Sequence, residues 1–172
     1  MHKFISVVAA LLLICLLPSC VTTTSGGFTV DASDEQALQD YIQLAIAYYD
    51  ADDMPSARRH VNSAIAIDDR NADIYNILAL ILQREGDLGL AEDNYQRAIS
   101  LDRNNARARN NYAVFLFSQE KFREAYDQLE QVANDTNYEG RAIAFENLGR
   151  SAVRLGQIDD AENAFERALQ LN

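Results

Sequence analysis

Few side chains in this sequence are suited to catalysis. The chain has two histidines, His2 and His60, and a general base or nucleophile needs a neighbour that activates it. His60 follows Arg58 and Arg59 at helical spacing, which is typical of a partly exposed histidine on a helix. The sequence therefore predicts a protein that is not an enzyme and has no small-molecule substrate.

Paired acidic residues could in principle bind a metal ion. Asp52-Asp53, Asp68-Asp69 and Asp159-Asp160 fall at expected turns or at a helix start, where carboxylates favour the amide-rich end of a helix. None has the one-three-five ligand spacing of a calcium loop. The seven glycines are scattered rather than gathered in a phosphate-binding loop, and no histidine/cysteine cluster suits zinc. We expect no metal ion and no cofactor.

Cys20 has the clearest chemistry in the chain. It ends Leu17-Pro18-Ser19-Cys20, which resembles the lipobox of bacterial lipoproteins, where the cysteine is acylated with diacylglycerol and the chain is cut before it. The preceding apolar run, residues 4–17, is shorter than the roughly twenty residues that span a bilayer. We predict a lipoprotein signal peptide over residues 1–19 and lipid attachment at Cys20. The alternatives are an ordinary secretory signal with a coincidental cysteine, or an uncleaved anchor.

Cleavage before Cys20 changes both the cysteine count and the charge. Cys15 would be lost with the leader, which leaves Cys20 as the one cysteine and allows no intrachain disulfide. Lys3 would be lost with no acidic residue, so the formal net charge of −11 becomes −12. An acidic surface repels phosphates, so we expect no nucleic acid partner.

The mature chain begins with a polar segment. Residues 20–32 lack apolar periodicity and include Thr22-Thr23-Thr24-Ser25-Gly26-Gly27, which is typical of a flexible tether. Ser33 with Gln36 three residues later is a capping-box pattern before an apolar-periodic run. We predict a folded domain over residues 33–172, with its first helix beginning near Ser33.

Small residues recur along the folded part at a fixed interval. Four alanines are separated by 34, 34 and 36 residues: Ala57, Ala91, Ala125 and Ala161. A period of 34 residues is the length of a tetratricopeptide repeat (TPR), in which two helices form a hairpin. The same spacing relates a second set of small residues: Ala45, Ala79, Ala113 and Gly149. We therefore predict an all-α solenoid of about four TPRs, over residues 38–71, 72–105, 106–141 and 142–172.

Turn residues separate the expected helices. Gly86 and Gly156 can supply a positive φ within two hairpins, and capping residues in 68–71 and 102–105 end the helices between repeats. A polar stretch over 134–140 predicts a longer loop between the third and fourth repeats. The final helix, expected over 159–171, carries Phe165, Leu169 and Leu171, and we expect part of this apolar surface to be uncovered.

The first helices of successive TPRs line a groove that suits a peptide or helix. Its first end is expected to be apolar and its last end polar and basic. We expect an exposed apolar patch that marks a protein contact, although packing within the core is the alternative for its residues: Ile42, Ile46, Tyr49 and Phe117. The full set of predicted groove residues is Ile42, Ile46, Tyr49, Asn76, Leu80, Gln83, Arg84, Asn110, Val114, Phe117, Glu146, Arg150 and Arg154.

Four segments carry more information than the repeat period. They are Tyr41-Ile42-Gln43-Leu44, Asn104-Asn105-Ala106-Arg107, Asn110-Asn111-Tyr112 with Phe115-Leu116, and Phe145-Glu146-Asn147-Leu148-Gly149. Together with the lipobox, these segments resemble the type IV pilus biogenesis/stability lipoproteins, the TPR pilotins. Members of that family tend to carry further repeats beyond the point that Asn172 occupies here.

The resemblance implies an outer-membrane lipoprotein that faces the periplasm. Its expected partner is the type IV pilus secretin, which it would help to reach the outer membrane and assemble into a multimeric ring. Val21, rather than Asp, after the lipidated cysteine resembles signals for transfer to the outer membrane. The alternative is a generic TPR lipoprotein that acts as a scaffold in envelope assembly or in regulation of peptidoglycan enzymes.

Overall fold

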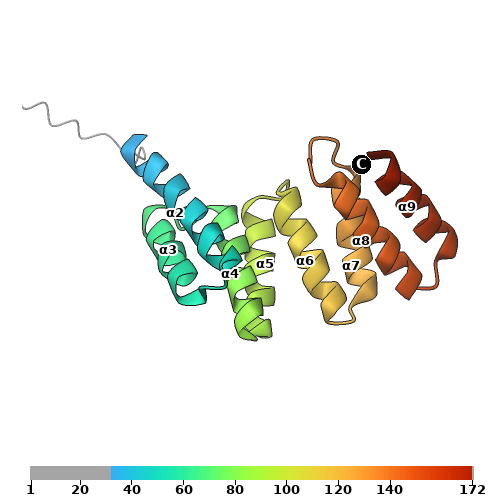
Figure 1. Cartoon of the computed structure of the whole chain (residues 1–172), viewed down its shortest axis with the longest axis horizontal. Helices are drawn as coiled ribbons and strands as arrows, with labels where there is room; N and C mark the ends of the chain where they lie inside the picture. Colours follow the sequence, from blue (N-terminus) through green and yellow to red (C-terminus); the bar gives the residue numbers. More distant parts are fainter. Residues whose placement is uncertain (1–31, 172) are drawn as a thin grey trace, which may run out of the picture. The chain divides into compact units, whose positions relative to one another are not determined.

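The computed structural model describes residues 32–171, and the regular elements in this range are all helices. They are α2 (Ala32–Asp50), α3 (Met54–Ile67), α4 (Ala72–Glu85), α5 (Leu88–Leu101), α6 (Ala106–Ser118), α7 (Phe122–Asn134), α8 (Arg141–Arg154) and α9 (Ile158–Leu171) (Figure 1). The predicted signal peptide, the lipid site at Cys20 and the tether up to residue 31 lie outside the described residues.

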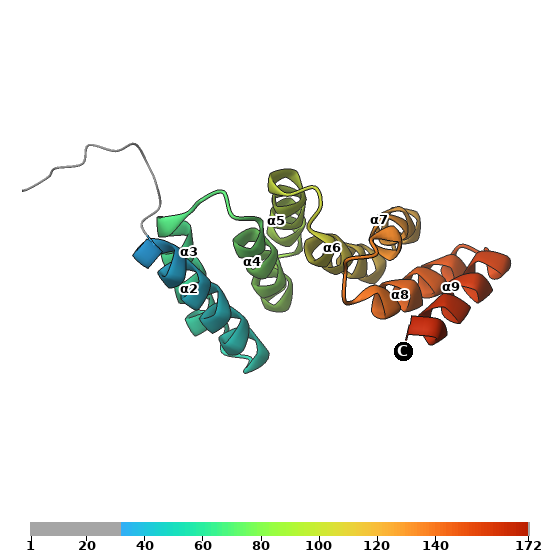
Figure 2. The same ribbon diagram turned by 90° about the horizontal axis from the view of Figure 1, so that it is seen from above.

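The helices pair into four hairpins that follow one another along the chain: α2–α3, α4–α5, α6–α7 and α8–α9. Seen from above, the first helices of the hairpins form one layer and the second helices the other (Figure 2). Neighbouring first helices contact each other from α2 to α4, α4 to α6 and α6 to α8. The predicted all-α TPR solenoid is confirmed.

The small residues mark the places where the two helices of a hairpin cross. Six alanines have side chains that are 0 % exposed: Ala45, Ala57, Ala79, Ala91, Ala113 and Ala125. In the fourth hairpin the small residue is Gly149, and a Cβ atom there would lie 2.7 Å from the ring of Phe165. Because a larger side chain at these positions would collide with the partner helix, the small-residue pattern sets the helix spacing.

A residue with positive φ lies in the turn between the two helices of every hairpin. Gly86 has φ 90° and Gly156 has φ 74°, as the glycine pattern predicts. The other two hairpins place non-glycine residues there, because Asp52 and Glu120 both have φ 60°. Left-handed backbone is costly for residues with a Cβ atom, so the residue types at positions 52 and 120 do not predict a positive φ there.

Asparagine side chains cap the first turns of α4 and α6, the first helices of the second and third hairpins. The Oδ1 atom of Asn71 accepts a hydrogen bond from the Asp73 amide at 3.0 Å, and that of Asn105 accepts one from the Ala108 amide at 2.9 Å. These are the capping segments that the sequence predicts.

The predicted capping box at the first helix is wrong. Helix α2 begins at Ala32, so Ser33 lies within its first turn. The amide of Gln36 does not reach back to Ser33; its Nε2 donates to Oδ1 of Asp40 at 2.8 Å, one turn further along the helix.

The last helix carries exposed apolar side chains. Leu169 is 78 % exposed and Leu171 is 46 % exposed, as expected, while Phe165 is half-buried against Gly149. Within residues 32–171, no helix combines the length and apolar character needed to cross a membrane.

Candidate protein-binding groove

The first hollow lies between α2, α4 and the start of α6, and it has a volume of about 420 Å³. It brings together five of the predicted groove residues: Ile42, Ile46, Tyr49, Asn76 and Leu80. The rest of its lining consists of Gln39, Gln43, Asp50, Asp73, Ile77, Arg107 and Asn111. Apolar side chains therefore meet polar and charged ones in one cavity.

The second hollow lies between α6, α7 and α8, and it has a volume of about 200 Å³. Three predicted groove residues line it: Val114, Phe117 and Arg150. The other lining residues are Ala113, Ser118, Leu129, Asn147 and Ser151. The sequence predicts one continuous groove, whereas in the structure the predicted residues line two separate cavities.

The four residues predicted to form an exposed apolar patch are buried or half-buried in the structure. Ile42 is only 5 % exposed and belongs to a core cluster with Leu38 and Ile77. Ile46, Tyr49 and Phe117 are half-buried and pack against core clusters. Each first helix packs against the next one, so the same side chains line a hollow and contribute to the core.

Asparagine side chains form hydrogen bonds between neighbouring repeats. Asn111 donates through Nδ2 to Oδ1 of Asn76 at 3.1 Å, and Asn105 donates through Nδ2 to Oδ1 of Asp73 at 2.9 Å. Asn76 and Asn110 are both buried, although the sequence predicts them as binding residues. Within the described range, Oδ1 of Asn110 has no hydrogen-bond partner.

Two predicted groove residues are already engaged within the protein. The Tyr95 hydroxyl donates to Oε1 of Gln83 at 2.8 Å. Arg84 donates to Oδ1 of Asp52 at 2.6 Å and to the Tyr49 hydroxyl at 3.1 Å, and its guanidinium lies 4.8 Å from the Tyr49 ring centroid. The hydrogen bond to Tyr49, followed by that to Asp52, raises the pKa of Arg84. Arg84 therefore connects the first two repeats.

The basic end of the predicted groove is built differently. The guanidinium of Arg150 lies 5.2 Å from the Phe117 ring centroid, and that of Arg154 lies 3.9 Å from the Phe122 ring centroid. The two rings meet edge to face with centroids 5.2 Å apart. Within residues 32–171, neither arginine forms an ion pair, and exposed Glu146 on the same helix forms none.

Several residues of the two hollows are missed by the sequence prediction. Gln39, Asp73 and Arg107 stand three residues, about one helical turn, before the predicted positions 42, 76 and 110. Extending the predicted stripe by one turn would have found them. Phe122 is the first residue of α7, the second helix of its hairpin. The groove prediction considers only first helices, so it could not include Phe122.

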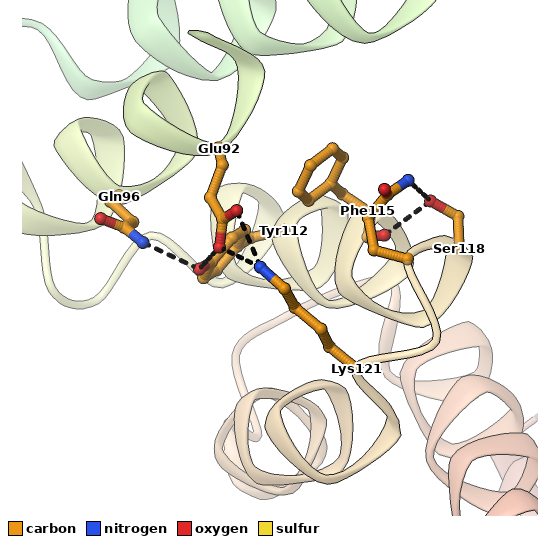
Figure 3. A network of polar contacts seen from close by, with 7 residues as sticks. Glu92, Gln96, Tyr112, Phe115, Ser118 and Lys121 are labelled. Atoms are coloured by element: carbon orange, nitrogen blue, oxygen red, sulfur yellow. Dashed lines mark hydrogen bonds and ion pairs between the residues drawn. The ribbon is translucent and has the colours of Figure 1, made fainter. Parts of the chain in front are cut away.

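A polar network joins the second repeat to the third (Figure 3). Lys121 donates through Nζ to both carboxylate oxygens of Glu92, at 2.9 and 2.8 Å, and the Tyr112 hydroxyl donates to Oε1 of Glu92 at 3.2 Å. Gln96 donates through Nε2 to the Tyr112 hydroxyl at 3.1 Å. Burial raises the pKa of Tyr112, and the hydrogen bond to Glu92 raises the pKa of Lys121. The network positions α6, which lines both hollows.

His60 is half-buried, as the sequence predicts, and its ring stacks on two tyrosines. The ring centroids of Tyr48 and Tyr41 lie 5.2 and 5.9 Å from that of His60. No group of three histidine, cysteine, aspartate or glutamate side chains that could hold a metal ion occurs in the part of the chain that the structure describes.

Comparison with protein families agrees with this architecture. Models of the tetratricopeptide repeat match residues 72–105 and 104–172, which together cover more than half of the chain. The chain is a tetratricopeptide repeat protein. TPR proteins of this kind act through interactions with other proteins, so the two hollows are candidate protein-binding sites.

Among its relatives, the type IV pilus assembly protein PilF of Pseudomonas aeruginosa is 35 % identical over 157 residues, which are 91 % of this chain and 62 % of PilF. This TPR chain thus spans less than two thirds of that relative. An uncharacterized protein of Haemophilus influenzae is 25 % identical over 157 residues, covering 91 % of this chain and 86 % of the relative.

Solved structures of type IV pilus proteins also resemble this chain. The structure of Pseudomonas aeruginosa PilF has a TM-score of 0.79 and 35 % identity, covering 81 % of this chain and 63 % of PilF. The structure of PilW, described as a widely conserved type IV pilus biogenesis factor, has a TM-score of 0.73 and 26 % identity, covering 78 % of this chain and 62 % of PilW. This TPR protein is related to the type IV pilus proteins PilF and PilW.

Proposed function

We propose that this protein is a lipid-anchored, non-enzymatic assembly factor of type IV pili that binds a pilus secretin through the first hollow. The relationship to PilF and PilW supports a role in pilus biogenesis. The lipobox at Cys20 and the residue after it support attachment to the periplasmic face of the outer membrane. The protein would act as a pilotin, which brings the secretin to that membrane and assists its multimerisation.

The observation that carries the proposal is the composition of the first hollow. Ile46 and Leu80 provide apolar contact area, while exposed Gln39 and Gln43 offer amide groups at its margin. This combination suits a peptide or helix whose apolar face is buried and whose backbone or polar side chains bond at the rim. The cavity lies on the first-helix layer, where TPR solenoids present their binding surface.

The experiment is a pull-down of the tagged, lipidated protein from solubilised outer membranes, with identification of the proteins that co-purify. Gln43→Trp places a bulky ring at an exposed position of the first hollow, so we expect recovery of the secretin to fall while the thermal melt stays unchanged. The matched control is Leu90→Ser, which changes an exposed apolar residue that lines neither hollow. Absence of a secretin from the wild-type sample would reject the proposal.

The lipid anchor has its own test. Cys20→Ala removes the acylation site, and acyl chains contribute roughly 0.8 kcal/mol per buried methylene, so we expect release from the outer membrane. Fractionation in high salt separates lipid anchoring from ionic attachment. Retention of the variant in the membrane pellet would contradict the anchor assignment.

A further inference from the structure

We propose that the second hollow is a separate subsite for an acidic segment of a partner protein. One apolar side chain of that segment would enter the hollow, and its carboxylates would bind Arg150 and Arg154. This inference rests on the proposed function in one respect, namely that the protein binds another protein through its first-helix layer.

Apolar side chains from α6 and α7 form one side of the second hollow. Ala113 and Leu129 form its floor and are buried in the core, while Val114 at its edge is 43 % exposed. Pockets for small-molecule ligands measure about 300–1,000 Å³, which is larger than the volume of about 200 Å³ found here. The cavity therefore fits a single apolar side chain of a peptide better than a separate small molecule.

The rim of the second hollow is cationic in a protein whose net charge is −11. The guanidinium of Arg154 lies over the Phe122 ring and 5.8 Å from the Phe117 ring centroid. The guanidinium of Arg150, which is also on α8, lies over the Phe117 ring. A guanidinium held near an aromatic ring by a cation–π contact still has N–H groups that can donate to a carboxylate. The aromatic rings thus hold two donors ready for an anionic group.

The described part of the chain gives these arginines no carboxylate of their own. The ion pairs found there are Arg58–Glu85, Arg84–Asp52 and Lys121–Glu92. Glu146 stands one helical turn before Arg150, the spacing at which an ion pair can form on a helix, yet the two side chains are not paired. A carboxylate from outside would therefore not have to displace an internal one.

Charge distinguishes this subsite from the first hollow. Asp50, Asp73 and Arg107 are the charged residues that line the first hollow, so acidic groups outnumber basic ones there. In the second hollow the charged lining residue is Arg150, with Arg154 beside it. An acidic segment is thus expected to select the second hollow.

The test uses the full-length protein in detergent and a fluorescein-labelled peptide, Gly-Ser-Asp-Phe-Glu-Asp-Ser-Gly. A neutral peptide with Asn and Gln in place of the acidic residues is the comparison. We expect fluorescence anisotropy to show roughly tenfold tighter binding of the acidic peptide, with the difference reduced at high salt. Arg150→Gln with Arg154→Gln should lower the affinity for the acidic peptide to that for the neutral one.

A charge-matched control separates the site from the overall field of the protein. Arg103→Gln with Arg167→Gln removes two exposed arginines that line neither hollow, and acidic-peptide binding should change less than about twofold. Equal binding of the two peptides, or an equal loss in the control, would overturn the proposal. Self-association that Arg150→Gln with Arg154→Gln abolishes would also overturn it, because the occupant would then be a second acidic chain.

The same experiment distinguishes this inference from the proposed function. Gln43→Trp should lower secretin recovery and leave acidic-peptide binding unchanged. If wild-type protein recovers no secretin but still prefers the acidic peptide, the pilotin role fails and the subsite stands. If the secretin is recovered and the peptides bind equally, the subsite fails and the pilotin role stands.

Discussion

The first and second hollows both lie between first helices of adjacent hairpins, yet their side chains make different contacts. Around the first hollow, Asn76 is bonded to Asn111, and Tyr49 is bonded to Arg84. Around the second hollow, Arg150 and Arg154 contact aromatic rings and form no ion pair within residues 32–171. A repeat position therefore places a side chain on the groove, while its neighbours in the adjacent repeat decide whether it is available to a partner.

The largest effect is expected where the second hollow meets the core. Leu129 is fully buried and forms the hollow's floor, so Leu129→Ala should lower the free energy of unfolding by about 2–5 kcal/mol. Val114→Ala at the exposed edge should cost less than about 0.5 kcal/mol. Urea denaturation of the two variants measures the difference. Similar losses would mean that floor and rim are not distinct.

A smaller effect is expected at the helix crossing behind the second hollow. A Cβ atom at Gly149 would lie 2.7 Å from the Phe165 ring, so Gly149→Ala should destabilise the fourth repeat by about 1–3 kcal/mol. Gly89→Ala is the matched control, because no other part of the protein crowds its Cβ position and a helical alanine is favoured. Hydrogen exchange should quicken across α8 and α9 but not across α2. Unchanged exchange in α8 would contradict the close contact.

Alkaline pH should loosen the connection between the second and third repeats. Folding raises the pKa of Tyr112 above its ordinary 10.0 and that of Lys121 above its ordinary 10.5. Groups whose pKa is raised by folding stabilise the protein below their ordinary pKa, and this contribution is lost as pH rises through the folded value. The melting temperature should therefore fall above about pH 10, and less steeply in Lys121→Met with Tyr112→Phe. Tyr41→Phe is the control, and its melting temperature should fall with pH as steeply as that of the wild type.

The smallest effect is expected at the turn that leads from α6 to α7. Glu120 has φ 60°, a conformation that glycine adopts without steric cost, so Glu120→Gly should stabilise the protein by about 0.5–1 kcal/mol. Glu124→Gly, in the first turn of α7, should instead lower stability by a similar amount, about 0.5–1 kcal/mol. Thermal melts of both variants in the same buffer show whether each substitution raises or lowers the melting temperature. A loss in both variants would show that Glu120 is not strained.

The repeat architecture could be predicted from the sequence because its determinants are local. Each hairpin requires small residues where its helices cross, and the spacing from Ala57 to Ala91 to Ala125 repeats that requirement along the chain. Gly86, Asn71 and Asn105 likewise mark turns and caps through their own backbone and side-chain preferences. These properties depend on residues close in sequence.

Only the tertiary structure decided which groove residues are buried, engaged or available. Ile42 lies in the core because the next first helix covers it, and Arg84 is held by two residues of the preceding repeat. Phe122 comes to lie beneath Arg154 because α7 begins where α8 passes. Contacts between residues more than thirty positions apart depend on how adjacent hairpins pack, and neither the helical period nor the repeat period contains that information.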